Sequence, residues 1–257
     1  GEKRDLLFNK NKFLKFSDKI IYLIYDKIPK LIEPIDNNDH ENEKDRKYIM
    51  NALYRENEQR NFISEGLINA DKNDLILISD VDEIPKLSSV DLENTNNEII
   101  LFKQNMFYYK YNLALPNFKW TGTKAVKKKK LISPQWLRNI KDRKYSFYRI
   151  DTLISDKKYM NIKIIKDGGW HFTNMKSPED MFEKFMNFGH HDEFKLSGIT
   201  TDIIKEKIKN KELFYNHFLD MRNQNKWESD YKLKKIDINN LPEYLIKNKS
   251  KYEKWFD

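Results

Sequence analysis

The stretch Leu75-Ile76-Leu77-Ile78-Ser79-Asp80-Val81-Asp82-Glu83-Ile84-Pro85 decides how the rest of the chain is interpreted. Its first four residues form a continuous apolar run, which is typical of a central strand buried on both faces, and the run stops abruptly at Ser79. Residues 43–70, just before it, show helical periodicity without a proline. A helix followed by a buried strand predicts an α/β sheet.

The aspartates that follow this strand are the sharpest chemical signal in the sequence. Open α/β sheets bind ligands beyond the carboxyl ends of their strands, which is where Asp80 and Asp82 are expected. Carboxylates two residues apart can face the same side, and their hard oxygens suit Mg²⁺ or Mn²⁺ bridging to phosphate. The alternative is a solvated acidic turn after a strand.

Apolar and β-branched runs predict several more strands. These are expected at residues 20–25, 99–109, 121–126, 146–153, 161–165 and 170–173. Ser177 as N-cap and Pro178 at the first helical position predict a helix that ends near residue 188. Since neither a repeat nor a linker divides the chain, we expect one domain, with the main unit at 1–199 and a helical extension at 200–257.

Composition limits the class of protein. The 257 residues are 39% hydrophobic, which is enough for a buried core. The net charge of +8 would attract anionic ligands such as sugar nucleotides, although it equally fits a solvated exterior. Without cysteine the chain has no disulfide, thiolate nucleophile or thiolate zinc ligand, and its compartment stays undetermined. No apolar stretch approaches the roughly 20 residues of a membrane span, and no signal-peptide core is evident.

A second cluster, Gly168-Gly169-Trp170-His171-Phe172, combines glycines with a histidine between aromatic residues. The glycines allow close approach of another backbone. Neutral His171 could ligate a metal or bind a sugar hydroxyl, and Trp170 could offer an apolar face to a sugar ring. A structural histidine is the alternative.

Other polar residues are candidates for the same site. Glu179 and Asp180 begin the predicted helix and could accept the proton of an acceptor hydroxyl, or simply stabilise the helix N-terminus. Arg60 could bind phosphate through its planar guanidinium, and Gly122 and Lys124 could line a donor site. For each of them an ordinary surface role is the alternative.

Two other functions share some of these features. A haloacid-dehalogenase-like phosphatase also has an apolar strand ending in Asp-x-Asp and would use Asp80 as nucleophile. However, that motif normally lies near the N-terminus and continues to Thr or Val, whereas 79 residues precede Asp80 here. A basic nucleic-acid-binding module would use the positive charge with the 14 Tyr and 16 Phe, but no recognition motif is present and no nucleic-acid partner is expected.

Four segments together resemble glycosyltransferase family 17. In order they are Gln59-Arg60-Asn61-Phe62, Leu77-Ile78-Ser79-Asp80-Val81-Asp82-Glu83-Ile84-Pro85, Gly122-Thr123-Lys124-Ala125-Val126 and Gly169-Trp170-His171-Phe172. The likeness covers roughly residues 10–195. That family contains the β-1,4-mannosyl-glycoprotein N-acetylglucosaminyltransferase that adds bisecting N-acetylglucosamine to N-glycans.

This resemblance implies a GT-A-type, Rossmann-like fold with a mixed central sheet flanked by helices. It also implies UDP-N-acetylglucosamine as donor, a glycan or glycoconjugate acceptor, and inversion at the anomeric carbon. Mn²⁺ or Mg²⁺ is then expected on Asp80 and Asp82, with His190 completing the metal site and His171 as the competing ligand.

The resemblance also assigns the remaining roles. Glu179 and Asp180 become the expected catalytic base. The expected donor site consists of Arg60, Asn61, Asp80, Gly122, Lys124, Trp170 and His171. Two departures from the family matter. The strand that opens the family domain, which helps to bind the nucleotide base, is expected ahead of the position that matches Gly1, and the segment after about residue 200 matches nothing in the family.

Overall fold

A mixed seven-stranded sheet is the centre of the computed structural model, which describes residues 5–91, 95, 98–145, 149, 151–187, 191–219 and 223–257. The strands run in the order β1-β4-β3-β6-β2, with β5 beside β3 and β7 beside β4. Their bounds are Leu75–Ile78 (β1), Glu83–Pro85 (β2), Ile99–Tyr108 (β3), Leu113–Lys127 (β4), Ile162–Ile165 (β5), Gly169–Thr173 (β6) and Lys234–Lys235 (β7).

The long strands β3 and β4 form an antiparallel pair that carries the other strands. Two short strands, β5 and β6, lie parallel to successive parts of β3. Strand β1 is antiparallel to β4, and β2 is antiparallel to β6. The prediction of a mixed α/β sheet flanked by helices is therefore confirmed.

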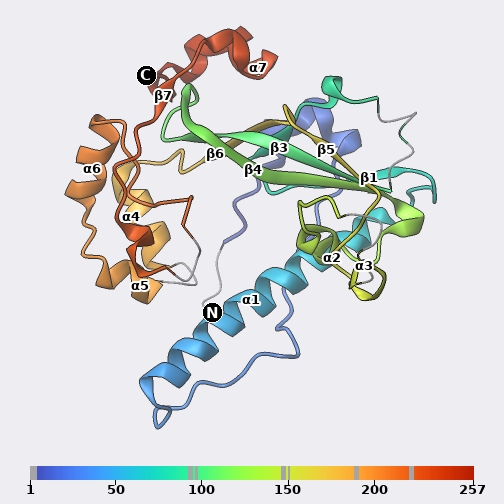
Figure 1. Ribbon diagram of the computed structural model, residues 1–257, viewed down its shortest axis with the longest axis horizontal. Coiled ribbons are helices and arrows are strands. Elements are labelled where there is room, and N and C mark those ends of the chain that lie inside the picture. The colour runs from blue at the N-terminus through green and yellow to red at the C-terminus, as the bar shows by residue number, and fades with distance from the viewer. Residues whose placement is uncertain are drawn as a thin grey trace.

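Helices gather at both ends of this sheet (Figure 1). The helices α4, α5 and α6 lie at one end, α2 and α3 lie at the other, and α1 projects away from the sheet (Figure 1). Their bounds are Glu41–Asn61 (α1), Pro134–Asn139 (α2), Asp151–Ile154 (α3), Pro178–Met186 (α4), His191–Leu196 (α5), Thr201–Lys209 (α6) and Glu243–Lys247 (α7). The 3₁₀ helices are η1 (Lys10–Lys19), η2 (Phe62–Leu67), η3 (Leu87–Ser89), η4 (Lys128–Lys130), η5 (Gln224–Trp227), η6 (Ile238–Asn240) and η7 (Lys249–Trp255).

Two predicted helices have the expected limits. The segment predicted at 43–70 forms α1, and η2 follows it directly. The other, α4, begins at Pro178, and the Ser177 side chain accepts a hydrogen bond of 3.1 Å from the Asp180 amide. Its last residue is Met186, close to the predicted end. Local capping chemistry was sufficient to place it.

The segment after Thr200 packs on the same core as the sheet. One cluster joins Met106 and Tyr108 of β3 to Met181 and Phe185 of α4. The later residues Ile204, Leu213, Phe214, Trp227 and Leu233 belong to this cluster as well. The segment is only partly helical, because β7 joins the edge of β4 and irregular chain surrounds it.

Strand β1 differs from its prediction in position. It pairs with β4 and is the outermost strand of the described sheet rather than a central one. Ile76 and Ile78 are buried, whereas Leu75 and Leu77 are half-buried. An apolar run indicates that both faces are covered, but it carries no information about hydrogen bonding along the two edges.

Two other predicted strands are wrong. Residues 20–25 are outside the sheet and lie along η2, where Tyr25 contacts Phe62 at a ring-centroid distance of 5.4 Å. Their apolar, β-branched composition favours extended backbone, but no strand pairs with them in the described chain. Of residues 146–153, the last three belong to α3, while 146–148 and 150 lie outside the described residues.

Within the described chain, none of the helices combines the length and apolar composition needed to cross a bilayer.

Candidate active site at the end of strand β1

Strand pairing brings four polar or aromatic side chains to one face of the sheet. Glu83 of β2 pairs with His171 of β6, and His171 is in register with Met106 of β3. Gln104, two residues earlier on β3, pairs with Trp120 of β4. Because paired residues share a face and alternate residues return to it, Glu83, Gln104, Trp120 and His171 all lie on the same side.

The aspartates lie in a tight turn that links β1 to β2. The Glu83 amide donates to the Asp80 carbonyl at 3.0 Å, and the Asp80 amide donates to Oε2 of Glu83 at 3.0 Å. Val81 at the tip is fully exposed. The side chains of Asp80 and Asp82 remain 40% and 35% exposed, so both are accessible to a ligand.

Glu83 is the buried anchor of this turn. Its side chain has 0% exposure, yet both carboxylate oxygens are hydrogen-bonded. Arg138 donates to them through Nη1 and Nη2, at 2.9 Å each, and Trp120 Nε1 donates at 2.8 Å. A buried carboxylate is tolerated when it is paired and satisfied in this way.

Two arginines hold the neighbouring Asp80. Arg138 of α2 donates to Oδ2 at 2.9 Å, and Arg60, near the end of α1, donates to Oδ1 at 3.2 Å. The side chain of Asn61 fixes the relation of the two helices, because it accepts a hydrogen bond of 3.0 Å from the Gln135 amide at the start of α2. Arg60 thus contacts Asp80, whereas Asn61 supports the helix that carries Arg138.

Gly122 lies at this site, and a side chain there would displace Gln104. A Cβ there would be 1.7 Å from Oε1 of Gln104, and the Gly122 carbonyl accepts a hydrogen bond of 2.7 Å from Arg138. Lys124, two residues on, is directed to the end of α2 instead. It donates to the carbonyls of Arg138 and Ile140 at 2.5 and 2.6 Å, and burial lowers its pKa to about 8.

Asp82 contacts the histidine of β6. Its Oδ2 is 3.3 Å from Nε2 of His171, and its carbonyl accepts a hydrogen bond of 2.9 Å from the Phe172 amide. Burial would raise the pKa of Asp82, but the hydrogen bond and charge of His171 outweigh it and the net pKa is lowered. His171 stacks on Trp120 with ring centroids 5.0 Å apart, and its buried Nδ1 has no partner among the described residues. Asp82 is therefore an ionised carboxylate at neutral pH.

An aromatic cavity of about 320 Å³ adjoins His171 and Trp120. Its other walls include the rings of Tyr108, Phe118, Tyr215 and Trp227, with His217 and Lys184 as polar groups. Small-molecule sites in proteins commonly combine apolar walls with a few polar groups in this way. The cavity therefore lies directly beside the Asp82–His171 pair.

Burial lowers the pKa values of two polar groups in the aromatic cavity, His217 and Lys184. Burial, with a further contribution from the charge of His171, lowers the pKa of His217 to about 4. Its Nε2 lies 2.9 Å from the Tyr108 hydroxyl. Burial also lowers the pKa of Lys184, partly offset by the charge of Asp82, and the ammonium donates to Asn174 at 2.8 Å.

The other predicted site residues lie elsewhere. Trp170 alternates with His171 along β6, so it faces the opposite side of the sheet, where its Nε1 donates to the Asn240 carbonyl at 2.7 Å. Glu179 is 61% exposed and lies 3.0 Å from Lys205. Asp180 lines a separate cavity with Lys110. His190 lies outside the described residues.

Four residues of this site escaped the sequence interpretation: Glu83, Trp120, Arg138 and His217. Glu83 had a visible signal, because it closes the acidic turn three residues after Asp80. The others lie 40 or more residues from Asp80, and nothing in their local sequence relates them to it.

The carboxylates suit a cation that a ligand helps to bind. Among the described residues, no group of three or more His, Asp or Glu side chains could hold a metal ion. Asp80 and Asp82 nevertheless provide hard oxygens, and Mg²⁺ commonly binds through one or two carboxylates together with substrate phosphates. The two carboxylates therefore fit a metal site that is completed by a bound ligand, and do not fit a site in which protein side chains supply every metal ligand.

No protein-family model, curated protein or solved structure matches this chain. The function must therefore be inferred from the residues of the site and from the resemblance of the four segments.

Proposed function

We propose that the chain is a metal-dependent glycosyltransferase with a GT-A-type fold, transferring N-acetylglucosamine from UDP-N-acetylglucosamine to a glycan hydroxyl with inversion. The observation that carries this proposal is the combination at the end of β1: two accessible aspartates, two arginines on Asp80, and an aromatic cavity beside the Asp82–His171 pair.

The donor diphosphate would be bound by charge. Arg60 and Arg138 present planar guanidinium groups, which match phosphate oxygens well. Asp82, with its lowered pKa, would hold Mn²⁺ or Mg²⁺ together with Asp80. When bound, the metal ion neutralises negative charge on the leaving diphosphate.

The acceptor would enter from the side of the aromatic cavity. Its volume of about 320 Å³ is at the lower end of the roughly 300–1,000 Å³ of small-molecule sites. Glu179 and Asp180, the carboxylates expected as the base, do not line this cavity: Glu179 pairs with Lys205, and Asp180 lines a separate cavity. Neither of them is therefore assigned the proton transfer at this site.

The phosphatase alternative is less favourable at this site. It requires Asp80 to attack phosphorus as a nucleophile, and the 79 residues that precede Asp80 do not match the usual place of that motif near the N-terminus. The expected result with p-nitrophenyl phosphate is no phosphate release. Release that depends on Asp80 would favour the phosphatase instead.

The decisive experiment is calorimetric titration of UDP and UDP-N-acetylglucosamine, with Mn²⁺ and with chelator. Binding should require the metal and should weaken by at least about tenfold in Asp82→Asn, which removes a metal-binding charge. Asp167→Asn is the matched control, since it changes an exposed aspartate paired with Lys86 and should bind as the wild type does. Equal binding in chelator, or unchanged binding by Asp82→Asn, would contradict the proposal.

A further inference from the structure

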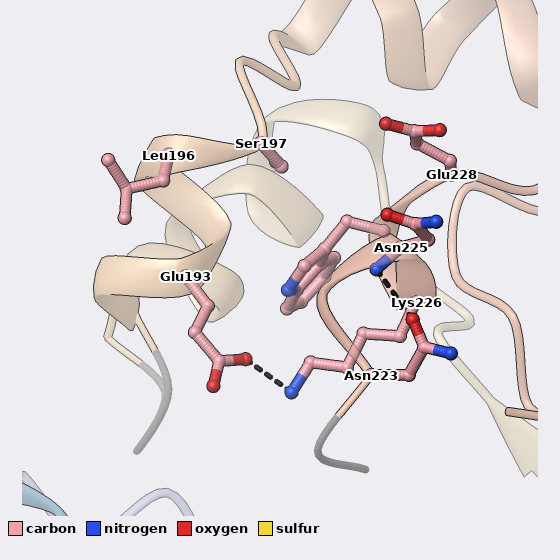
Figure 2. Close-up of a pocket in the computed structure, with 8 residues that line it drawn as sticks. Glu193, Leu196, Ser197, Asn223, Asn225, Lys226 and Glu228 are labelled. Atoms are coloured by element: carbon pink, nitrogen blue, oxygen red, sulfur yellow. Dashed lines mark hydrogen bonds and ion pairs between the residues drawn. The ribbon is translucent and has the colours of Figure 1, made fainter. Parts of the chain in front are cut away.

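A second cavity lies between α5 and the segment that contains η5 (Figure 2). We call it the amide-lined cavity. Its volume is about 600 Å³, well within the roughly 300–1,000 Å³ of ligand sites. Glu193 of α5 lies on one side of it and Asn223 and Asn225 lie on the other, while the Leu196 side chain points away from these residues (Figure 2).

The charges on its wall exclude several ligand classes. The cation on the wall, Lys226, is 4% exposed and forms an ion pair with Glu193 (Figure 2). A phosphate or carboxylate ligand would therefore compete with Glu193 for Lys226 and would also meet the carboxylate of Glu228. A divalent cation is disfavoured because, among the described residues, no cluster of metal-binding side chains exists here.

The remaining groups suit a neutral ligand with many hydroxyls. Amide side chains both donate and accept hydrogen bonds, and a carboxylate accepts them from hydroxyl groups. Asn223, Asn225 and Glu228 are exposed on the wall and present both kinds of group. A purely apolar ligand would leave these groups unpaired, which costs free energy.

Trp227 is the independent indication of a ligand. Its side chain is 7% exposed and lines the cavity, yet its indole N–H has no hydrogen-bond partner among the described residues. Buried indole N–H groups normally have a partner. A hydroxyl group bound in the cavity would supply the missing acceptor.

We propose that the amide-lined cavity binds a neutral carbohydrate outside the proposed donor site. Lys226 and Trp227 form part of the wall of both this cavity and the aromatic cavity, so the two spaces adjoin. Given the proposed function, on which this assignment rests, the cavity holds the part of the acceptor glycan remote from the reacting hydroxyl. The binding itself requires neither metal nor nucleotide.

The test is direct titration of the whole chain, in chelator and without nucleotide, with N,N′-diacetylchitobiose, mannobiose, lactose and cellobiose. Calorimetry or ligand-observed NMR should detect binding of at least one of these neutral disaccharides, and glucose 6-phosphate should bind more weakly. Because Asn225 and Glu228 are exposed, their replacement should leave the fold intact. The double variant Asn225→Ala, Glu228→Ala should weaken binding about tenfold or more.

Three further variants sharpen the result. Trp227→Phe keeps an aromatic ring in the core but removes the N–H, and should weaken binding severalfold. Asn38→Ala, in an exposed turn before α1, is the matched control and should bind as the wild type does. Asp82→Asn should also bind normally, so that loss of donor binding and loss of saccharide binding are distinguished. Absence of binding by all four disaccharides, or unchanged binding by the double variant, would overturn the proposal.

Discussion

Two regions on one face of the sheet handle polar groups in opposite ways. In the ionic cluster of Asp80, Glu83, Arg60 and Arg138, opposite charges are paired and the buried carboxylate has several donors. In the aromatic cavity, the polar groups are kept largely uncharged or weakly paired, and the pKa of His217 is lowered to about 4. The Trp120–His171 stack separates the two regions.

This difference indicates a division of roles. The Glu83–Arg138 pair is the fixed part of the ionic cluster, because removal of either partner leaves an unbalanced buried charge, whereas Asp80 is 40% exposed. The aromatic cavity can exchange partners at lower cost, since its walls are largely apolar and His217 is held neutral. Substrate binding is therefore expected to change the cavity more than the cluster.

The largest effect should come from Arg138→Met. It leaves the fully buried Glu83 without its cation, and loss of one partner from a buried pair costs about 3–5 kcal/mol. Chemical denaturation should show this loss in the free energy of unfolding. Arg46→Met is the control, because Arg46 pairs with Glu33 and Glu43 at the surface and its loss should cost under about 1 kcal/mol. Equal losses of unfolding free energy in the two variants would show that the Arg138–Glu83 pair contributes no more than a surface ion pair.

A pH series should reveal the neutral state of His217. In the unfolded chain this histidine binds a proton near pH 6.5, whereas the folded chain resists protonation until about pH 4. Since the unfolded state binds more protons between these values, stability should fall with decreasing pH, by up to about 3 kcal/mol. Subtracting the pH dependence of His217→Phe isolates this contribution. Identical profiles for the two proteins would show that His217 is not held neutral.

The smallest effect on stability should come from Trp120→Phe, at the residue that lies between the ionic cluster and the aromatic cavity. The variant keeps an aromatic ring against His171 but removes the N–H that donates to Glu83. Because Arg138 and the Asp80 amide still donate to Glu83, the cost should be about 1 kcal/mol in thermal or chemical unfolding. A loss as large as that of Arg138→Met would mean that the indole, and not the guanidinium, is the main partner of Glu83.

Much of the local structure could be predicted from the sequence. The helix at α4 followed from Ser177 and Pro178, and the strand before Asp80 followed from its apolar run. The acidic turn was recognised by its spacing alone. The strand predicted at residues 20–25 is wrong, because an apolar run favours extended backbone but does not supply a neighbouring strand.

The site itself could be predicted only in part. Asp80, Asp82 and His171 were chosen for their residue types, and tertiary structure brings Asp82 and His171 into contact. Trp170 was grouped with His171 because the two are adjacent in sequence, yet alternation along β6 places them on opposite faces. That separation follows from the period of a strand and could have been anticipated.

By itself, the sequence determined which short segments become helix or strand and where an acidic turn ends a strand, because capping, periodicity and chain breaks act over a few residues. Tertiary structure alone decided that β1 is an edge strand, that Arg138 neutralises Glu83, and that Gly122 packs against the side chain of Gln104. Those outcomes depend on strand register and burial between residues far apart in the chain, and no local pattern encodes which distant charge or side chain will occupy the neighbouring space.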